Sequence, residues 1–206
     1  MRTAVTLVAK GPSAKNALAI VRDGDAIACV NDAGMLLPGE DIDYVFFSDA
    51  NVFPLLEPMR DRFERAISRK MNQAQLESMP DWLVMRHSMY DDISCAGEHD
   101  ELCQRVILGG IMNHHSTPGA LHWLAKYGKY NTIRVVGVDG GTRYANNLSA
   151  PGAAKYDLDE WATVTRRVGD ICSRVYGTVI EWHSLKLSFQ PKHAASECMT
   201  KTGDRL

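Results

Sequence analysis

The sequence has few cysteines and no long hydrophobic run, and these two absences exclude several classes of protein. Five cysteines in 206 residues form no CxxC pair. Their odd number and scattered spacing predict reduced thiols and no cysteine-based metal site. No apolar run approaches the roughly 20 residues that a membrane helix needs, and the first apolar run is too short for a signal peptide. We therefore expect a cytoplasmic protein with no membrane span.

An excess of charge of one sign is also lacking. The 23 Lys and Arg residues against 25 Asp and Glu residues give a formal net charge of −2. The overall charge therefore does not favour nucleic acid as a partner. Basic residues do gather at one place, but Asp61 and Glu64 interleave with them, so we interpret the stretch as the solvated face of a helix. Its basic members are Arg60, Arg62, Arg65, Arg69 and Lys70.

Apolar runs that alternate with helical patterns predict an α/β fold. Three of the expected strands, 4–9, 26–30 and 132–139, are short and nearly continuously apolar, as in strands buried on both faces. A strand at 43–49 is rich in aromatic and β-branched residues, and further strands are expected at 81–87 and 177–184. The expected helices follow residue 13 and cover 55–71, 117–128 and 157–176. Such βαβ units imply one doubly wound, mostly parallel, Rossmann-like sheet with helices on both faces. We expect residues 1–189 to form a single catalytic domain and 190–206 to be a flexible tail.

One expected helix carries a clear apolar line. Met59, Phe63, Ile67 and Met71 recur at a spacing of four within 55–71. On a helix this spacing gathers side chains on one face. We therefore expect these four residues in the core.

Polar residues follow the expected strands at one position after another. In open α/β sheets, ligands bind beyond the carboxyl ends of the strands, near the point where the strand order reverses. A series of polar strand ends therefore predicts a lined cleft. The residues concerned are Lys10 to Ser13, Asn31, Asp32, Ser48, Asp49, His87, Asp139 and Gly140.

The turn after the first expected strand suits an anionic ligand. Gly11 lets the backbone approach a ligand closely, Pro12 fits the first turn of a helix, and Ser13 adds a hydroxyl. The start of a helix carries unsatisfied N–H groups and partial positive charge, so this turn can hold a phosphate. A plain strand-to-helix connection is the alternative. Neither a Walker A loop nor a GxGxxG motif is present.

Four segments together resemble two related families. They read VAKGPSAKNAL, DAIACVND, DYVFFSD and STPGALHWLAKYGKYNTIRVVGVDGG. In order and spacing they resemble the bacterial sialyltransferases of lipooligosaccharide synthesis and, equally, the 6-hydroxymethylpterin diphosphokinase-like proteins. Both families begin with a strand, a G-x-GPS turn and a helix, and later have a strand that ends in G-[IV]-D. The resemblance covers roughly residues 3–50 and 105–145 of this chain.

The resemblance implies a set of donor-binding residues. Gly11, Pro12 and Ser13 would hold the phosphates, and Asn31 would bind the nucleotide's sugar or the transferred group. Ser116 and Thr117 would meet the nucleotide, and Asp139 and Gly140 would lie near the nucleoside. The chain has Ala9 and Lys10 where the families have glycine and commonly asparagine. Lys10 offers a phosphate a positive charge instead.

The resemblance to the sialyltransferases also implies catalytic residues. Tyr144 and Tyr156, with Arg143 beside them, would stabilise charge on the departing phosphate. A histidine would take the proton of the acceptor hydroxyl. His87, which we place at a strand end, and the adjacent pair His114 and His115 are the candidates.

We thus expect a glycosyltransferase with a nucleotide-sugar donor, for example a CMP-sugar, and an unspecified acceptor. This activity requires no cofactor. One alternative is Mg²⁺-dependent pyrophosphoryl transfer from ATP, in which Asp32, Asp49 and Asp139 would bind the metal. Another is a nucleotide-binding module without catalysis.

Overall fold

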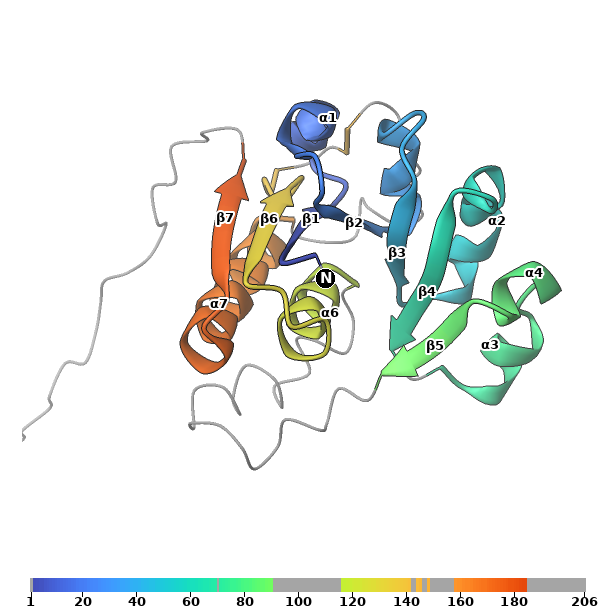
Figure 1. Ribbon diagram of the computed structural model, residues 1–206. Coiled ribbons are helices and arrows are strands. Elements are labelled where there is room, and N and C mark those ends of the chain that lie inside the picture. Colours follow the sequence, from blue (N-terminus) through green and yellow to red (C-terminus); the bar gives the residue numbers. More distant parts are fainter. Residues whose placement is uncertain are drawn as a thin grey trace, which may run out of the picture.

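The computed structural model describes residues 2–69, 71–90, 116–141, 144, 145, 148 and 158–184. Its centre is one open sheet of seven strands in the order β5-β4-β3-β2-β1-β6-β7, and every neighbouring pair is parallel (Figure 1). The predicted doubly wound parallel sheet is thereby confirmed. The strands are β1 (Ala4–Val8), β2 (Ala26–Val30), β3 (Ile42–Phe47), β4 (Phe63–Arg69), β5 (His87–Tyr90), β6 (Thr132–Val136) and β7 (Val179–His183).

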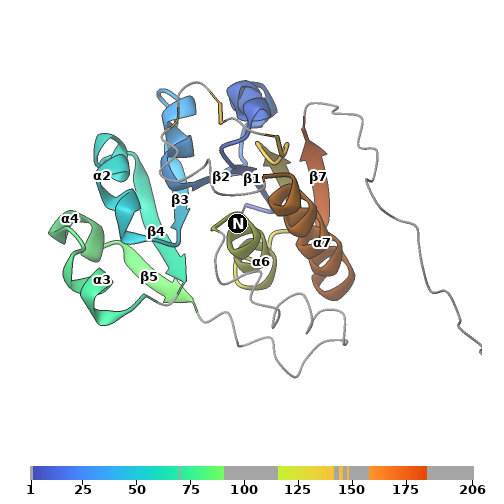
Figure 2. The ribbon, with the colours of Figure 1, turned by 180° about the vertical axis from the view of Figure 1, so that it is seen from behind.

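Helices cover both faces of the sheet. On one face α6 (Ser116–Lys126) and α7 (Leu158–Tyr176) lie side by side (Figure 2). Among the described residues, the helices on the other face are short helices and 3₁₀ turns. They are η1 (Pro12–Asn16), α1 (Ala17–Ile20), η2 (Asn31–Leu36), η3 (Ala50–Val52), α2 (Phe53–Leu56), η4 (Glu57–Met59), α3 (Gln73–Glu77) and α4 (Asp81–Val84).

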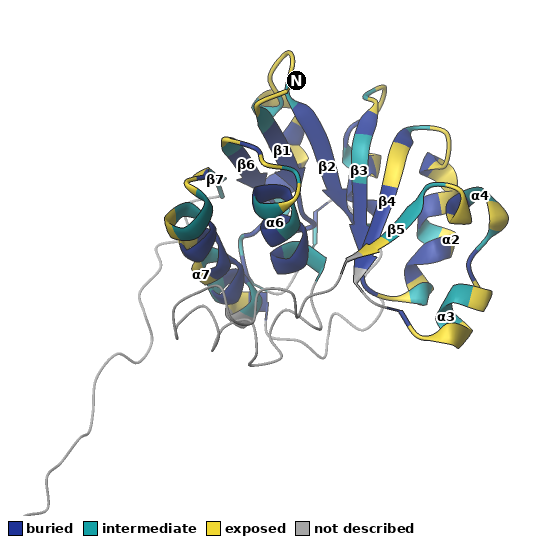
Figure 3. Cartoon of the chain, turned by 60° about the horizontal axis from the view of Figure 1, so that its bottom comes forward, coloured by how far each residue is buried: buried dark blue, intermediate teal, exposed yellow. Residues whose placement is uncertain are grey.

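The central strands are buried because both of their faces are covered. Leu7 and Val8 are neighbours on β1, yet they pack into different cores on opposite faces of the sheet. Every residue of β2 is buried (Figure 3). This double burial explains why these strands are continuous apolar runs in the sequence.

The order of the strands reverses between β1 and β6. The chain proceeds outward from β1 to β5 and then returns to form β6 on the other side of β1. The helices that follow β1 and β6 therefore leave the sheet in different directions. This is the switch point at which α/β sheets bind ligands.

The prediction of a helix at 55–71 is wrong. Residues 63–69 form the strand β4, and only 53–59 are helical, as α2 followed by η4. Met59, Phe63, Ile67 and Met71 are buried as expected. A spacing of four fits the two-residue period of a strand as well as the 3.6-residue period of a helix. Pro58, inside the expected helix, was the contrary signal, because a proline there costs about 3 kcal/mol.

The basic residues around this strand are consequently not the solvated face of a helix. The Arg62 guanidinium donates to the carbonyl oxygens of Leu37 and Glu40, so it fastens the loop that follows η2. Arg65 lies over the ring of Trp123, 5.8 Å from its centroid. Arg60 does remain exposed and pairs with Glu57.

The expected strand at 81–87 is also displaced. Residues 81–84 form α4, directly after Pro80, and the strand β5 begins at His87 instead of ending there. Nε2 of His87 lies 2.8 Å from Oγ of Ser68, and its ring stacks on Phe47. Burial lowers the pKa of His87, so its neutral form is favoured near neutral pH.

His87 makes the fold sensitive to acid. Because its folded pKa lies below the unfolded value of about 6.5, its contribution to stability is complete above that value and is lost as pH falls through the folded pKa. In melting curves between about pH 8 and pH 5 we expect wild type to lose stability more steeply than His87→Gln. Parallel pH profiles of the two proteins would contradict this assignment.

Two remaining predictions concern the C-terminal tail and the lack of a membrane-spanning helix. The predicted tail at 190–206 and residues 91–115 lie outside the described residues. Within the described part of the chain, the helices are all too short or too polar to cross a bilayer.

Candidate functional site

The turns that follow β1 and β6 are in direct contact at the switch point. The N–H of Gly11 donates to the carbonyl of Gly137 at 2.8 Å, and the N–H of Ala9 donates to that of Val136 at 2.8 Å. A Cβ on Gly11 would lie 2.6 Å from the oxygen of Gly137. Gly137 has a φ of +85°, and its own Cβ would lie 2.5 Å from the oxygen of Ala9. Only glycine fits at either position without movement of the backbone.

Ser13 joins the two turns through both its side chain and its backbone. Its hydroxyl accepts a hydrogen bond from the N–H of Gly137 at 2.9 Å, and its N–H donates to Oδ2 of Asp139 at 2.6 Å. The next N–H, that of Ala14, donates to Gly11. The carboxylate of Asp139 thus binds the amide at which we expected a phosphate. In this structure the Gly-Pro-Ser turn is closed by the protein's own acceptors.

Lys10 brings a positive charge to the switch point. Its ammonium lies 2.5 Å from Oδ1 of Asp32, and each of the two side chains is only 7% exposed. The ammonium also lies over the ring of Tyr144, 5.0 Å from its centroid. The backbone of Ala145 donates to the carbonyl of Lys10, so the segment around Tyr144 is held against β1. Asp32 thus neutralises the charge of Lys10 in this structure, and the pair lies directly before the Gly-Pro-Ser turn.

Asn31 stands at the end of β2 in a strained conformation. Its φ is +54°, which non-glycine residues adopt rarely and which asparagine tolerates better than most. Its Oδ1 is buried and finds no hydrogen-bond partner among the described residues. A strained backbone together with a buried acceptor that receives no hydrogen bond is typical of a residue held in place for a ligand.

Two hydroxyl groups link the end of β3 to the start of α6. Oγ of the buried Ser48 lies 2.8 Å from Oγ of Ser116. Thr117 follows in the first turn of α6 and is half-buried. This contact places the amino end of an 11-residue helix, with its partial positive charge, at the carboxyl edge of the sheet.

The structure therefore gathers most of the predicted donor-binding residues along one edge, from β3 through β2 and β1 to β6. The exposed Asp49 follows β3 at the same edge. His87 lies on β5, two strands beyond β3, and its ring stacks on Phe47, which directly precedes Ser48. From β1 it is four strand spacings away, roughly 19 Å across the sheet. Three predicted catalytic residues, His115, Arg143 and Tyr156, lie outside the described residues, as does His114.

Two further side chains border this edge that the sequence patterns did not single out as site residues. Asp159, in the first turn of α7, accepts a hydrogen bond from the N–H of Gly141 at 2.8 Å. An acid in the first turn of a long helix was the available signal. His183 ends β7 beside β6, and its Nε2 lies 3.8 Å from Oε2 of Glu181. Its place directly at the end of a strand was the only sequence signal for it.

The aspartates expected to bind Mg²⁺ are separate in this structure. Asp32 pairs with Lys10, and Asp139 accepts from Ser13. Among the described residues, no three His, Cys, Asp or Glu side chains come together in a group that could hold a metal.

No protein-family model matches the chain, and no curated protein matches it. Among solved structures, it is similar to the sialyltransferase CstII from Campylobacter jejuni in complex with a substrate analogue, CMP-3FNeuAc. The TM-score is 0.55 at 13% sequence identity, over 87% of this chain and 80% of that one. The chain has a sialyltransferase-like fold.

A second similar structure is a variant of the sialyltransferase Cst-II in complex with CMP. Its TM-score is 0.46 at 12% identity, over 86% of this chain and 80% of that one. The similarity to CstII supports the fold that the resemblance to the sialyltransferases implies, and the resemblance to the pterin diphosphokinase-like proteins is not supported.

Proposed function

We propose that this protein is a glycosyltransferase that binds a nucleotide-activated sugar, in the first place a CMP-sugar, and transfers the glycosyl group to an acceptor hydroxyl. One observation carries the proposal. The residues that resemble the sialyltransferase motifs meet at the switch point of a sialyltransferase-like fold, where β1, β2, β3 and β6 end. Switch points are where such sheets bind nucleotides.

In this proposal the donor lies along the carboxyl edge of the sheet. Lys10 interacts with the phosphate, and the glycine at Gly11 leaves the turn without a side chain. Asn31 uses its Oδ1, which accepts no hydrogen bond from the described residues, to bind the sugar of the nucleotide or the transferred group. Ser116 and Thr117 bind the donor from the start of α6, and Asp139 and Gly140 border the nucleoside.

The chemistry is a substitution at the anomeric carbon. The acceptor oxygen forms the new bond, the bond to the phosphate oxygen breaks, and its electron pair leaves with the nucleotide. Arg143, Tyr144 and Tyr156 stabilise the charge on that phosphate. His115 takes the acceptor proton. His87 is the alternative base, on β5 two strands beyond β3.

Thermal shift tests the donor class directly. We expect CMP and a CMP-sugar to raise the melting temperature without Mg²⁺, by the equivalent of about 2.7 kcal/mol at a hundredfold excess over Kd. UDP-sugars, GDP-sugars and ATP, each with and without Mg²⁺, are the comparison ligands. Stabilisation by ATP only with Mg²⁺ would replace this proposal by pyrophosphoryl transfer. Binding without turnover would favour a nucleotide-binding module, and no shift with any nucleotide would refute the proposal.

Asn31→Gly tests the role of the strained asparagine. Glycine adopts the same φ without strain, so the fold should be retained, while the amide group is lost. We expect nucleotide affinity to fall about tenfold, the effect of losing one good hydrogen bond, as measured by calorimetry. Lys129→Gly is the matched control, since Lys129 also has a φ of +54° but follows α6 at the opposite edge of the sheet. Equal losses in the two variants would contradict the assignment.

A further inference from the structure

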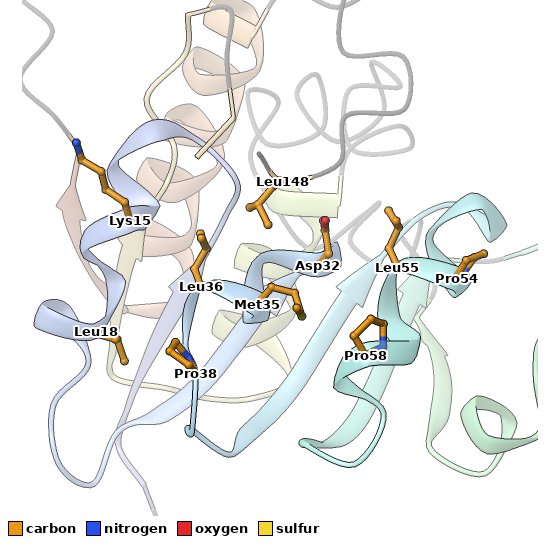
Figure 4. A pocket seen from close by; sticks show the side chains of 10 residues that line it. All are labelled: Lys15, Leu18, Asp32, Met35, Leu36, Pro38, Pro54, Leu55, Pro58 and Leu148. Carbon is orange, nitrogen blue, oxygen red and sulfur yellow. The ribbon is translucent and has the colours of Figure 1, made fainter. Parts of the chain in front are cut away.

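The structure has a cavity next to the switch point. A cavity of about 640 Å³ opens beside Asp32, on the sheet face that carries α1, η2 and α2 (Figure 4). One wall comes from η2 and the turn after it, and the other from α2 and η4. We call this cavity the apolar groove, and its walls are Met35, Leu36, Pro38, Pro54, Leu55 and Pro58.

Most of the side chains that line the groove are apolar. Met35 is 46% exposed, and Leu18 beside it is 48% exposed. The ammonium of Lys15 points away from the other lining side chains, and the carboxylate of Asp32 is the other charged group of the lining (Figure 4). Its volume lies within the range of small-molecule sites, which are mostly apolar with a few polar groups.

The groove and the proposed donor site meet at one ion pair. Asp32 lines the groove and contacts Lys10, and Lys10 directly precedes Gly11 at the switch point. A group-transfer enzyme has to hold two substrates so that their reacting atoms are neighbours. The cavity ends beside Asp32, which pairs with Lys10, the proposed partner of the donor phosphate. It is therefore in the right place for the second substrate.

We propose that the apolar groove binds the apolar part of the acceptor, an alkyl or aryl group attached to the hydroxyl-bearing moiety. This inference rests on the proposed function. The apolar group lies between η2 and α2, and the hydroxyl end points toward Asp32, whose carboxylate accepts a hydrogen bond. Pro38, Pro54 and Pro58 give the groove walls of restricted backbone freedom, which lowers the entropy cost of binding.

Alkyl glucosides of increasing chain length test this site without any donor. Methyl to octyl β-D-glucoside, kept below the micelle concentration, would be titrated into protein with ¹³C-labelled methionine methyl groups. We expect the Met35 resonance to shift and the affinity to rise about threefold for each methylene that enters the groove. The resonance of Met85, which is 88% exposed and outside the groove, should not shift.

Matched variants complete the test. Met35→Glu should weaken octyl glucoside binding at least tenfold, and Met85→Glu should leave it unchanged. The inference would be overturned if glucoside affinity did not depend on chain length. It would also be overturned if the methyl resonances of Met35 and Met85 shifted equally. Nucleotide thermal shift is read separately. Nucleotide binding without chain-length dependence refutes only the groove, and groove binding without any nucleotide binding refutes its role as an acceptor site.

Discussion

Gly137→Ala should destabilise the protein by about 3 kcal/mol, because two costs combine at one residue. The φ of +85° disfavours any residue with a Cβ. The new methyl group would also lie 2.5 Å from the oxygen of Ala9 and 3.0 Å from Cβ of Ala14. Because these atoms belong to the turn after β1, the clash cannot be relieved by rotation of a flexible side chain. Urea unfolding followed by circular dichroism would measure the loss.

Two further variants separate the two costs. Gly24 has a φ of +83° with no atom within 4 Å of its Cβ position, so Gly24→Ala carries the backbone strain alone and should cost about 1 kcal/mol. Gly11 carries the close approach without a positive φ, since its Cβ would lie 2.6 Å from the oxygen of Gly137. Gly11→Ala should therefore cost about 2 kcal/mol. If Gly24→Ala and Gly137→Ala lost the same stability, the contact between the new Cβ at residue 137 and the oxygen of Ala9 would not contribute to the loss.

The same contact connects stability with the proposed donor site. Movement of the Gly137 turn away from β1 would break the hydrogen bonds that Ser13 makes with Gly137 and with Asp139. We therefore infer that Gly137→Ala weakens nucleotide binding even at temperatures at which the variant is folded.

Much of the fold was predictable from the sequence because burial on both faces leaves a direct signal. β1, β2 and β6 are short, mostly apolar runs, and each is found close to where its run predicted it. β3 and β7 also lie close to their predicted positions. Once the strands are known to be parallel, the strand ends must share one edge. The gathering of Lys10, Asn31 and Asp139 near that edge therefore followed from the sequence and topology together.

The errors arose where short segments carry two periodicities. The apolar line through Phe63 and Ile67 fits a helix and a strand, and the prolines at 54 and 58 were the better guide. Residues 81–87 contain an apolar run too short to distinguish a strand from one helical turn. The displacement of that strand moved His87 from the end of a strand to its beginning.

Side-chain partners at the site could not be predicted because they join distant parts of the chain. Ser13 and Asp139 are 126 residues apart in sequence. The ion pair of Lys10 with Asp32 depends on the conformations of the turns that follow β1 and β2. No periodicity encodes such pairs. These partners change the interpretation of the Gly-Pro-Ser turn, because the N–H groups of Ser13 and Ala14 already donate to acceptors of the protein itself. Lys10 is therefore the residue to test for phosphate binding.

Breaking the buried pair of Lys10 and Asp32 should affect stability and nucleotide binding in different ways. Either Lys10→Met or Asp32→Asn removes one charge and leaves the other buried, at a cost of about 3 kcal/mol. In the double variant neither charge remains, so its loss should be well below the sum of the single losses. Urea unfolding of the four proteins measures this coupling. Additive losses would show that the 2.5 Å contact contributes little to the stability of the folded protein.

Nucleotide binding should instead depend on the charge of Lys10 alone. If Lys10 interacts with the donor phosphate, Lys10→Met weakens CMP binding about tenfold or more, the effect of one lost charge-assisted hydrogen bond. Asp32→Asn removes the carboxylate that competes with the phosphate for the ammonium, so it should strengthen CMP binding. The double variant should recover stability but not affinity. Calorimetry decides between the two roles of the lysine, since a purely structural Lys10 predicts that the two single variants weaken CMP binding alike.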